Sequence, residues 1–255
     1  RQAVFARYVI EDGGRVGFEV ARYDASRPLV IDPILSFATF LGGSSSDVAL
    51  PIVVNRGSLY VASITISPDF PVTFTGFRHD STRYDICVTK LDAAGSTTIY
   101  SACLGGDRDD GVEFRNNTIF PKLAIAVDNA GNAYIAGSTL SDNFPVTANA
   151  FQQDYGSCVP VILGTCRFRG FVTKIDATGT ALVYSTYLRG GELMSENDLF
   201  GVAVDGAGNA WVTGTALHHF PTTAGAFQRD PSEFFHKDAL VTLLQRGVRV
   251  EEDRS

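Results

Sequence analysis

The 255-residue sequence has few of the residues that carry common chemistry: one methionine, one tryptophan, four histidines and four cysteines. Only 19% of its residues are charged and the formal net charge is −7, so the basic patch needed to bind nucleic acid or an anionic membrane surface is missing. No apolar run reaches the length of about 18 residues that a membrane-spanning helix needs. We therefore expect neither nucleic acid as a partner nor insertion into a membrane.

Apolar residues and turn formers, in contrast, are abundant. The chain is 45% apolar and has 25 glycines and ten prolines, which lie at the ends of short runs rich in Val, Ile, Tyr and Phe. This pattern is typical of many short strands joined by turns. The composition predicts a folded, all-β protein with almost no helix. Because the sequence begins with Arg1 and has its only methionine at Met194, we expect it to be a piece of a longer protein.

One cassette of strands and turns occurs three times. Each copy has an aromatic residue in an apolar run and, shortly after it, a Phe-Pro pair. The aromatic anchors are Tyr60, Tyr134 and Trp211, and the pairs begin at Phe70, Phe144 and Phe220. Such regular recurrence indicates a repeat architecture. We expect the recurring aromatic residues to pack between repeats rather than to stack on a sugar.

The second repeat predicts four strands in two hairpins. Residues 123–127 and 133–137 flank Asp-Asn-Ala-Gly-Asn, and residues 171–175 and 182–188 flank Asp-Ala-Thr-Gly-Thr. Both linking sequences favour tight turns, because Gly accepts positive φ and Asp or Asn bonds to the nearby backbone. The third repeat predicts strands at 201–204, 211–213 and 239–243, and the more diverged first repeat at 52–54, 59–62, 86–91 and 98–104.

Serial four-stranded antiparallel meanders are typical of the blades of a β-propeller. A β-sandwich is the alternative, but it would not explain why turns, strands and Phe-Pro pairs repeat in phase. The third repeat shows no fourth strand, and known propellers use about four to eight blades. The sequence therefore predicts about three blades in an incomplete ring over residues 36–245, followed by a polar tail over 246–255. Within this range, residues 36–43 (SFATFLGG) look like a fourth strand without its own blade.

Residues 1–35 do not match a blade. Two apolar runs around residues 11–14 predict a hairpin with Val16, Phe18 and Val20 on one face. We interpret this hairpin as the end of a preceding β-rich domain.

The long links of the repeats are expected on one face of the meander, because they all join second to third strands or fourth to first strands. We call this the long-loop face; it comprises residues 65–85, 105–122, 139–170, 189–200 and 215–237. A rigid scaffold that carries variable loops on one side is the usual arrangement of a binding surface. The sequence therefore predicts the functional site on this face.

Several segments together resemble the bacterial SBBP repeat, which is named for seven-bladed β-propellers. They are LVIDPILSFATFLGG from residue 29, VYSTYLRGG from residue 183, FVTKIDATGT from residue 171, the two AVDxxGNA hairpins and the Phe-Pro links. The resemblance extends over residues 29–245. It implies a secreted or surface-attached bacterial protein of several domains, with further blades in the parent chain. It supplies no catalytic residues.

The four cysteines form two candidate pairs. Cys87 and Cys103 lie on the predicted third and fourth strands of the first repeat, directly opposite each other if Lys90 pairs with Tyr100. A cross-strand disulfide and a reduced, buried pair are both compatible with this register. Cys158 and Cys166 lie in an inserted loop, and we expect them to be paired in an oxidising compartment.

Metal and cofactor signals are weak. Asp107, Asp109 and Asp110 form an acidic turn that could gather oxygen ligands for calcium, but the twelve-residue loop with its terminal Glu is missing. We prefer a solvated loop there, and turn formation alone for the Asp-x-x-Gly-Asn motifs. The adjacent His218 and His219 point in opposite directions in an extended segment. No other cofactor is expected.

The first functional hypothesis is a non-catalytic, extracellular or cell-surface β-propeller module that binds protein or glycan on the long-loop face, or acts as a spacer. The alternative is a polysaccharide-active hydrolase or lyase with its site in the axial funnel of a complete ring. An enzyme should show converging carboxylates or histidines with perturbed pKa values, whereas a binding module should show an exposed aromatic or apolar patch. No nucleophile motif such as Gly-x-Ser-x-Gly supports the enzyme.

Overall fold

The structure is a computed structural model and describes residues 4–10, 16–27, 29, 35, 37–77, 82–115, 118–156, 168–191, 196–217, 220–229 and 237–245. The chain divides into two compact units, Arg1–Ala38 and Thr39–Ser255. The described residues form strands and turns without any helix, which confirms the all-β prediction. A helix suited to crossing a membrane is accordingly not found among them.

The first unit contains one hairpin. Strand β1 (Ala6–Ile10) pairs antiparallel with β2 (Val16–Val20), with Ala6 opposite Val20. The predicted hairpin is thus present, while the side chains of Val16 and Phe18 lie outside the described part of the chain. The assignment of residues 1–35 to the end of a preceding domain stays a prediction.

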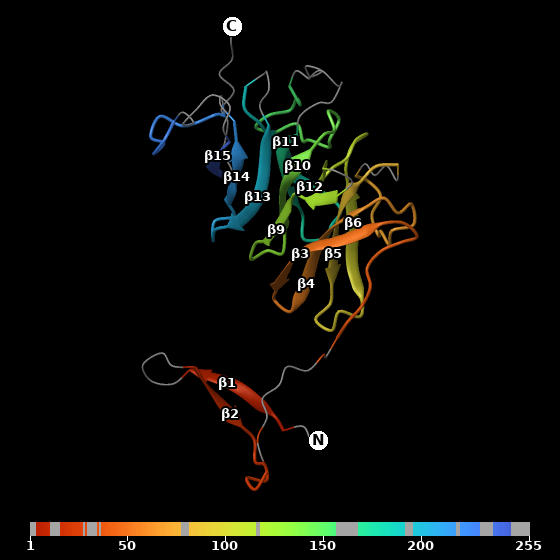
Figure 1. Ribbon diagram of the computed structural model, residues 1–255, viewed down its shortest axis with the longest axis vertical. Coiled ribbons are helices and arrows are strands. Elements are labelled where there is room, and N and C mark those ends of the chain that lie inside the picture. Colours follow the sequence, from red (N-terminus) through yellow and green to blue (C-terminus); the bar gives the residue numbers. More distant parts are fainter. Residues whose placement is uncertain are drawn as a thin grey trace. The chain divides into compact units, whose positions relative to one another are not determined.

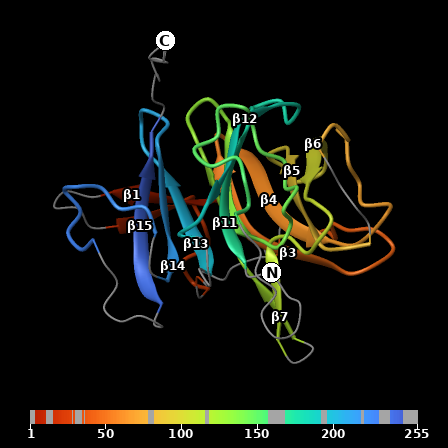
Figure 2. The ribbon, with the colours of Figure 1, turned by 90° about the horizontal axis from the view of Figure 1, so that it is seen from above.

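The second unit contains three antiparallel sheets with the strand order of propeller blades (Figures 1 and 2). Blade 1 consists of β3 (Asp47–Asn55), β4 (Ser58–Thr65), β5 (Asp85–Leu91) and β6 (Thr98–Leu104). Blade 2 consists of β9 (Leu123–Val127), β10 (Ala133–Thr139), β11 (Arg169–Ile175) and β12 (Leu182–Leu188). Blade 3 has three strands, β13 (Asn197–Val204), β14 (Ala210–Ala216) and β15 (Asp238–Leu244). The described sheets do not close a ring, as predicted.

The tight turns follow from the local sequence. In the turn between β9 and β10, Asp128 Oδ1 accepts hydrogen bonds from the backbone N–H groups of Ala130 and Asn132, both at 2.9 Å. Gly131 adopts φ +87° there, a conformation that costs little only for glycine. The turn between β13 and β14 repeats these bonds with Asp205 as acceptor.

The hydrophobic core lies between blades. We call the face of a blade that is turned toward the next blade of the chain its front face, and the opposite face its back face. The front face of blade 1 and the back face of blade 2 share one cluster, which includes Tyr60, Ala62, Ile64, Ile125, Ile135 and Phe171. The second cluster joins blades 2 and 3 and includes Tyr134, Ala136, Val172, Leu199, Ala210 and Val212. Since burying one such large side chain contributes about 1.5–3 kcal/mol, each blade depends on its neighbours for stability.

An additional hairpin, which the sequence did not predict, lies in the link between blades 1 and 2. Strand β7 (Val112–Arg115) pairs with β8 (Thr118–Pro121) in a separate two-stranded sheet. The residues that flank the hairpin are joined by a hydrogen bond from Lys122 N to Gly111 O, which is 2.8 Å long. Figure 2 shows β7 extending away from the blades. The segment expected to be a loop at 105–122 is therefore partly an ordered projection.

Candidate functional site on the long-loop face

The order of the strands gathers the long links at one side of the three blades. In each antiparallel blade the first and third strands begin where the second and fourth strands end. The links that follow β4, β6, β10, β12 and β14 therefore start on the same side, and the tight turns lie on the other. The side chains that project on the long-loop face decide what chemistry this face can offer.

A recurring polar clasp fixes the links that lead into blades 1 and 2. In the link that precedes blade 2, Gly106 N donates to Asp110 Oδ2 at 2.7 Å and Ser141 Oγ donates to the same oxygen at 3.1 Å. A Cβ atom at Gly106 would lie 2.3 Å from the Cβ of Ser141, so only glycine fits this close approach. In the link that precedes blade 1, Asp47 Oδ2 accepts hydrogen bonds from Gly43 N at 2.7 Å and Ser67 Oγ at 2.9 Å.

The residues before the first two Phe-Pro pairs complete the clasp. Asp69 Oδ1 accepts a hydrogen bond from Ser44 N at 2.6 Å, and Asn143 Oδ1 accepts one from Asp107 N at 2.9 Å. These bonds join the Phe-Pro link of one blade to the Gly-Gly segment that enters the same blade. They explain physically why the Gly-Gly and Phe-Pro pairs recur in phase.

The acidic turn is only partly solvated. Asp107 is exposed and binds Asn143, and Asp109 is half-buried and accepts a hydrogen bond from Tyr84 N at 3.2 Å. Asp110, however, is fully buried and also accepts a hydrogen bond from Thr139 Oγ1, so the prediction of a solvated loop is wrong at this position. Burial raises the pKa of Asp110 well above its usual range, although hydrogen bonds from Thr139 and Gly106 oppose the shift. This burial could not be predicted from the sequence, because Thr139 and Ser141 belong to a distant strand and link.

The three aspartates do not gather around a common point. Each binds a different partner, and the described residues contain no group of three His, Cys, Asp or Glu side chains placed to hold a metal ion. The histidines lie outside the described residues, as do Cys158 and Cys166. Calcium was only a weak candidate at these aspartates, and its binding stays untested.

A buried ion cluster links blades 2 and 3 on the long-loop face. Asp198, the second residue of β13, lies 2.6 Å from Lys122 Nζ and 2.9 Å from Lys237 Nζ, and it accepts a hydrogen bond from Ser138 Oγ at 3.1 Å. Glu113 of β7 lies 2.5 Å from Lys122 Nζ. In addition, Lys237 forms an ion pair with Glu196 at 2.9 Å.

The electrostatics of this cluster favour the charged forms of Asp198 and Lys237. Burial alone would raise the pKa of Asp198, but the hydrogen bonds and charges of Lys122 and Lys237 outweigh burial and lower it. Burial likewise opposes the charge of Lys237, yet Glu196 and Asp198 raise its pKa. A general acid or base that works near pH 7 needs shifts in the opposite directions. The cluster is therefore suited to joining blades and to fixing the base of β7.

Sequence reasoning missed this cluster because its members lie far apart in the chain. The available signal was a charged residue directly before or at the start of an apolar strand, as in Lys122 before β9, Asp198 in β13 and Lys237 before β15. Because the first and third strands of a blade begin on the same face, these charged residues all lie on that face.

The β7–β8 hairpin is the most distinctive element of the long-loop face. Val112 is fully buried at its base and Ile119 packs against the first core cluster. Glu113 ties the hairpin to the ion cluster. Phe120, in contrast, is 45% exposed. The hairpin thus combines a fixed base with an exposed aromatic side chain.

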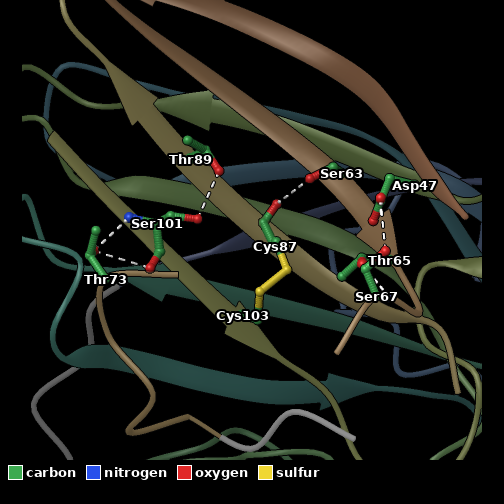
Figure 3. The surroundings of a disulfide bond; sticks show 9 residues. All are labelled: Asp47, Ser63, Thr65, Ser67, Thr73, Cys87, Thr89, Ser101 and Cys103. Carbon is green, nitrogen blue, oxygen red and sulfur yellow. Dashed lines mark hydrogen bonds between the residues drawn. A yellow bond between two sulfur atoms is a disulfide. The ribbon is translucent and has the colours of Figure 1, made fainter. Parts of the chain in front are cut away.

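The disulfide between Cys87 and Cys103 stabilises the hairpin formed by β5 and β6 (Figure 3). The two residues lie directly opposite each other with 4.0 Å between their Cα atoms, and Lys90 lies opposite Tyr100, in the predicted register. Both sulfur-bearing side chains are buried and pack with Phe70. Of the two alternatives that the sequence left open, the structure has the cross-strand disulfide rather than the reduced pair.

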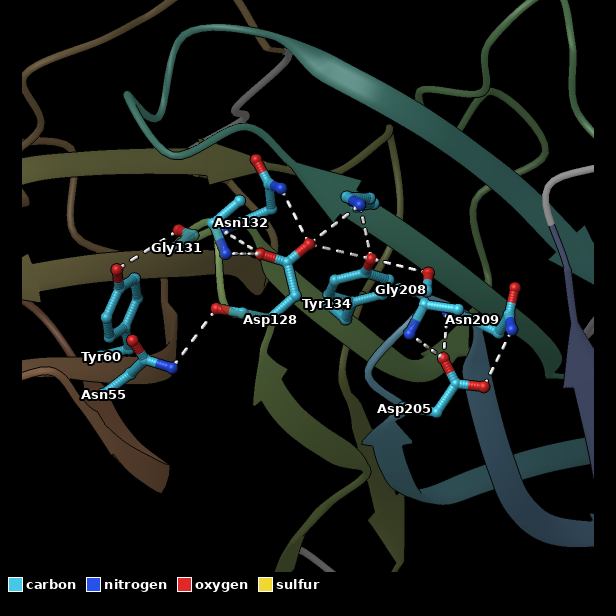
Figure 4. A network of polar contacts seen from close by, with 12 residues as sticks. Asn55, Tyr60, Asp128, Gly131, Asn132, Tyr134, Asp205, Gly208 and Asn209 are labelled. Atoms are coloured by element: carbon cyan, nitrogen blue, oxygen red, sulfur yellow. Dashed lines mark hydrogen bonds and ion pairs between the residues drawn. The ribbon is translucent and has the colours of Figure 1, made fainter.

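A tyrosine from each of the first two blades reaches into the first turn of the next blade (Figure 4). Tyr60 Oη donates to Gly131 O at 3.2 Å, and Tyr134 Oη donates to Gly208 O at 2.9 Å. Lys174 Nζ lies 3.0 Å from Asp128 Oδ2. Although burial opposes the shift, hydrogen bonds from Asn132 and the charge of Lys174 lower the pKa of Asp128 to about 2. The two Asp-x-x-Gly-Asn motifs form the predicted turns, and they also accept contacts from the preceding blade, which were not predicted for them.

A comparison of the sequence with models of protein families matches part of this region. The family model of the SBBP beta-propeller repeat matches residues 112–145. This chain carries an SBBP beta-propeller repeat. The SBBP match begins at β7, includes the hairpin of β9 and β10, and ends with the Phe144-Pro145 pair, so it contains both the tight turn and the link that closes the clasp. A comparison with curated proteins found no match.

Proposed function

We propose that this SBBP propeller module is a non-catalytic interaction module that binds protein or glycan through the long-loop face, with the β7–β8 hairpin as the principal contact. The observation that carries the proposal is the hairpin itself. An ordered element that is tied down at its base by Val112 and Glu113 presents Phe120 without a large loss of conformational entropy on binding. Exposed aromatic side chains on rigid supports are frequent anchors of interfaces.

The charge arrangement supports the non-catalytic part of the proposal. The buried carboxylate of Asp198 is engaged by two lysines, and the buried Asp110 is enclosed by Gly106, Thr139 and Ser141. Neither carboxylate is open to a polysaccharide. Each serves the connection between blades.

We further propose an extracellular or cell-surface location. The buried Cys87–Cys103 disulfide supports this, because disulfides form and persist mainly in oxidising compartments. The location is tested directly by fractionating the source cells, with a marker protein for each compartment, and by detecting the chain at the cell surface. Recovery of the chain from the reducing interior alone would contradict it.

Binding is tested with the 255-residue chain on an array of defined glycans and on a display library of folded and unfolded peptides. Phe120→Ser should weaken binding to any probe that the wild type retains by about tenfold or more. Phe151→Ser is the matched control, because Phe151 is 48% exposed in another link of the same face. Equal binding by wild type and Phe120→Ser would contradict the role of the hairpin. Release of new reducing ends from a bound glycan would contradict the non-catalytic assignment.

A further inference from the structure

Blade 3 is built like the other two blades but its front face is open. Val88 of β5 and Val172 of β11 are fully buried, whereas Val241, which holds the same register position in β15, is 68% exposed. Trp211 is 44% exposed, while its counterparts Tyr60 and Tyr134 are buried in the next blade. The face that joins blade 1 to blade 2, and blade 2 to blade 3, therefore ends in an apolar surface.

Blade 3 also retains the threonine that holds the fourth strand in the other two blades. In blade 1, Thr73 holds the fourth strand through the Thr73 N to Ser101 O and Ser101 N to Thr73 Oγ1 hydrogen bonds, both 2.8 Å long. Thr147 makes the same two bonds to Ser185 of β12 in blade 2, each 3.0 Å long. Thr223 occupies the same position after the third Phe-Pro pair.

The local turn that begins at Thr223 is already formed in blade 3. Ala226 N donates to Thr223 O at 3.0 Å, as Ala150 N donates to Thr147 O at 3.0 Å. The outer edge of β15 pairs with no strand of the described chain. Position, turn and strand edge together form a slot for one more antiparallel strand.

The chain itself carries a strand sequence that matches this slot. Residues 37–41 (FATFL) precede Gly42-Gly43 as residues 100–104 of β6 (YSACL) precede Gly105-Gly106. Gly43 already binds Asp47 in the clasp that leads into blade 1. Nevertheless, none of the described residues 37–43 lies in a strand, and Phe40 is fully exposed. This segment has the sequence of a fourth strand but follows no blade in the part of the chain that the structure describes.

The back face of blade 1 is open as well. Ile52 is 59% exposed, whereas Ile125, its counterpart in blade 2, is 7% exposed and packs against blade 1. Val54 and Ile99 are also exposed. One chain therefore presents both halves of an interface of the kind that it uses twice internally.

We infer that two copies of this chain assemble head to tail into a six-bladed ring, in which residues 37–41 of each copy form the fourth strand of the other copy's blade 3. A fourth strand leads through Gly-Gly directly into the next blade. Docking of this segment therefore brings the back face of blade 1 against the partner's blade 3, in phase with the existing blade contacts. Trp211 then packs on the turn at residues 55–58, as Tyr60 packs on the turn at Gly131.

Symmetry and blade number favour a second copy over other occupants. A two-fold axis makes both junctions identical, so the assembly closes and buries both open faces. Six blades lie within the range of about four to eight that known propellers use. Closure also removes the exposed strand edge of β15, which would otherwise promote aggregation.

The register of the native disulfide supplies the test. Phe40 corresponds to Cys103 and Leu240 to Cys87, so the structure places Phe40 of one copy opposite Leu240 of the other. The variants Phe40→Cys and Leu240→Cys are prepared separately, mixed in equal amounts and oxidised. A covalent species of twice the 27.4 kDa chain mass, formed at least tenfold faster than in a mixture of Phe40→Cys with Phe151→Cys, is expected. The wild type, which has the same native cysteines, serves as the blank.

Sedimentation equilibrium of the unmodified chain completes the test. We expect a mass of twice the monomer, and a monomer for Val241→Lys, which places a charge in the junction but on a side chain that is exposed in the single chain. A wild-type monomer at all concentrations would overturn the inference and leave completion by further blades of a longer chain. An open series of oligomers, or a cross-link no faster than the control, would overturn it equally.

Discussion

Blades 2 and 3 share strand register and first turn but differ in their neighbours. Blade 2 is covered on both faces, and its Tyr134 is buried against the turn of the next blade. Blade 3 has the same register with Trp211 at that position, yet this side chain is 44% exposed. The comparison shows that burial at equivalent positions is set by the place of a blade in the arc rather than by its own sequence.

The clasps of the two blades differ in the same sense. Blade 2 uses the carboxyl group of the buried Asp110, whereas blade 3 has the amide side chain of Asn197 at this position. Gly190 N still donates to Asn197 Oδ1 at 3.0 Å, as Gly106 N donates to Asp110. The neighbouring Asp198 instead forms the ion cluster with Lys122 and Lys237. Blade 3 thus replaces part of a hydrogen-bonded clasp with an ionic connection.

The largest effect is expected when this ionic connection is broken. Asp198→Ala leaves Lys122 and Lys237 without their shared carboxylate, and removing one partner of a buried ion pair costs about 3–5 kcal/mol. Urea denaturation measures the free energy of unfolding. Asp154→Ala is the control, because Asp154 forms an exposed ion pair with Arg189 and such pairs contribute about 1 kcal/mol or less. Equal losses would show that the cluster does not join the blades.

A pair of valine substitutions tests the difference in burial directly. Val172→Ala opens a cavity between blades 2 and 3 and should lower the free energy of unfolding by about 2 kcal/mol. Val241→Ala, measured in the Phe40→Asp background to keep the chain monomeric, should change it by less than about 0.5 kcal/mol. A large loss for Val241→Ala in that background would mean that the front face of blade 3 is already covered within one chain.

Removal of single hydroxyl groups gives a smaller difference. Tyr134→Phe removes bonds to Gly208 O and to the charged Lys174, and it should cost about 1.5–2 kcal/mol. Tyr60→Phe removes one neutral bond to Gly131 O and should cost about 1 kcal/mol. Thermal and urea unfolding check both values. A reversed order would contradict the role of Lys174 in the turn.

The smallest effect is a pH dependence from the same turn. The pKa of Asp128 is about 2 in the folded chain against an ordinary value of 3.8, so its contribution to stability is complete above pH 3.8 and declines as the pH falls toward 2. The free-energy difference between wild type and Asp128→Asn should therefore shrink over this interval, from about 1 kcal/mol or less. Asp205→Asn shows what remains without a lysine, because Leu243 occupies the position of Lys174 in blade 3. Hydrogen bonds from Asn209 lower the pKa of Asp205 as well, so a pH dependence in the same direction is expected there. A difference that does not change with pH would contradict the assigned pKa.

Local signals in the sequence were sufficient for most strands. The turn at Asp128 and the turn at Asp176 define hairpins through contacts within a few residues, so β12 was predicted with its full length. Strands β3 and β13 were predicted too short, since their registers shift between Ala49 and Ile52 and between Leu199 and Gly201. Each shift interrupts the apolar alternation by which the start of the strand would be recognised.

The site was less accessible to sequence reasoning because it depends on distant residues. The ion cluster of Lys122, Asp198 and Lys237 forms only after two blades have packed. Asp110 is buried beside Ser141, which lies in a link further along the chain. The cysteine pair was the exception, because the register of a single hairpin placed Cys87 opposite Cys103.

The most direct test of the proposed dimer uses the fluorescence of Trp211, the single tryptophan of the chain. We expect emission typical of a partly exposed indole at high dilution, and a shift to shorter wavelength with reduced acrylamide quenching as the concentration rises. The Val241→Lys variant should keep the dilute spectrum at every concentration. A wild-type spectrum that does not change with concentration and equals that of the variant would contradict the claim that a second copy covers the open face of blade 3.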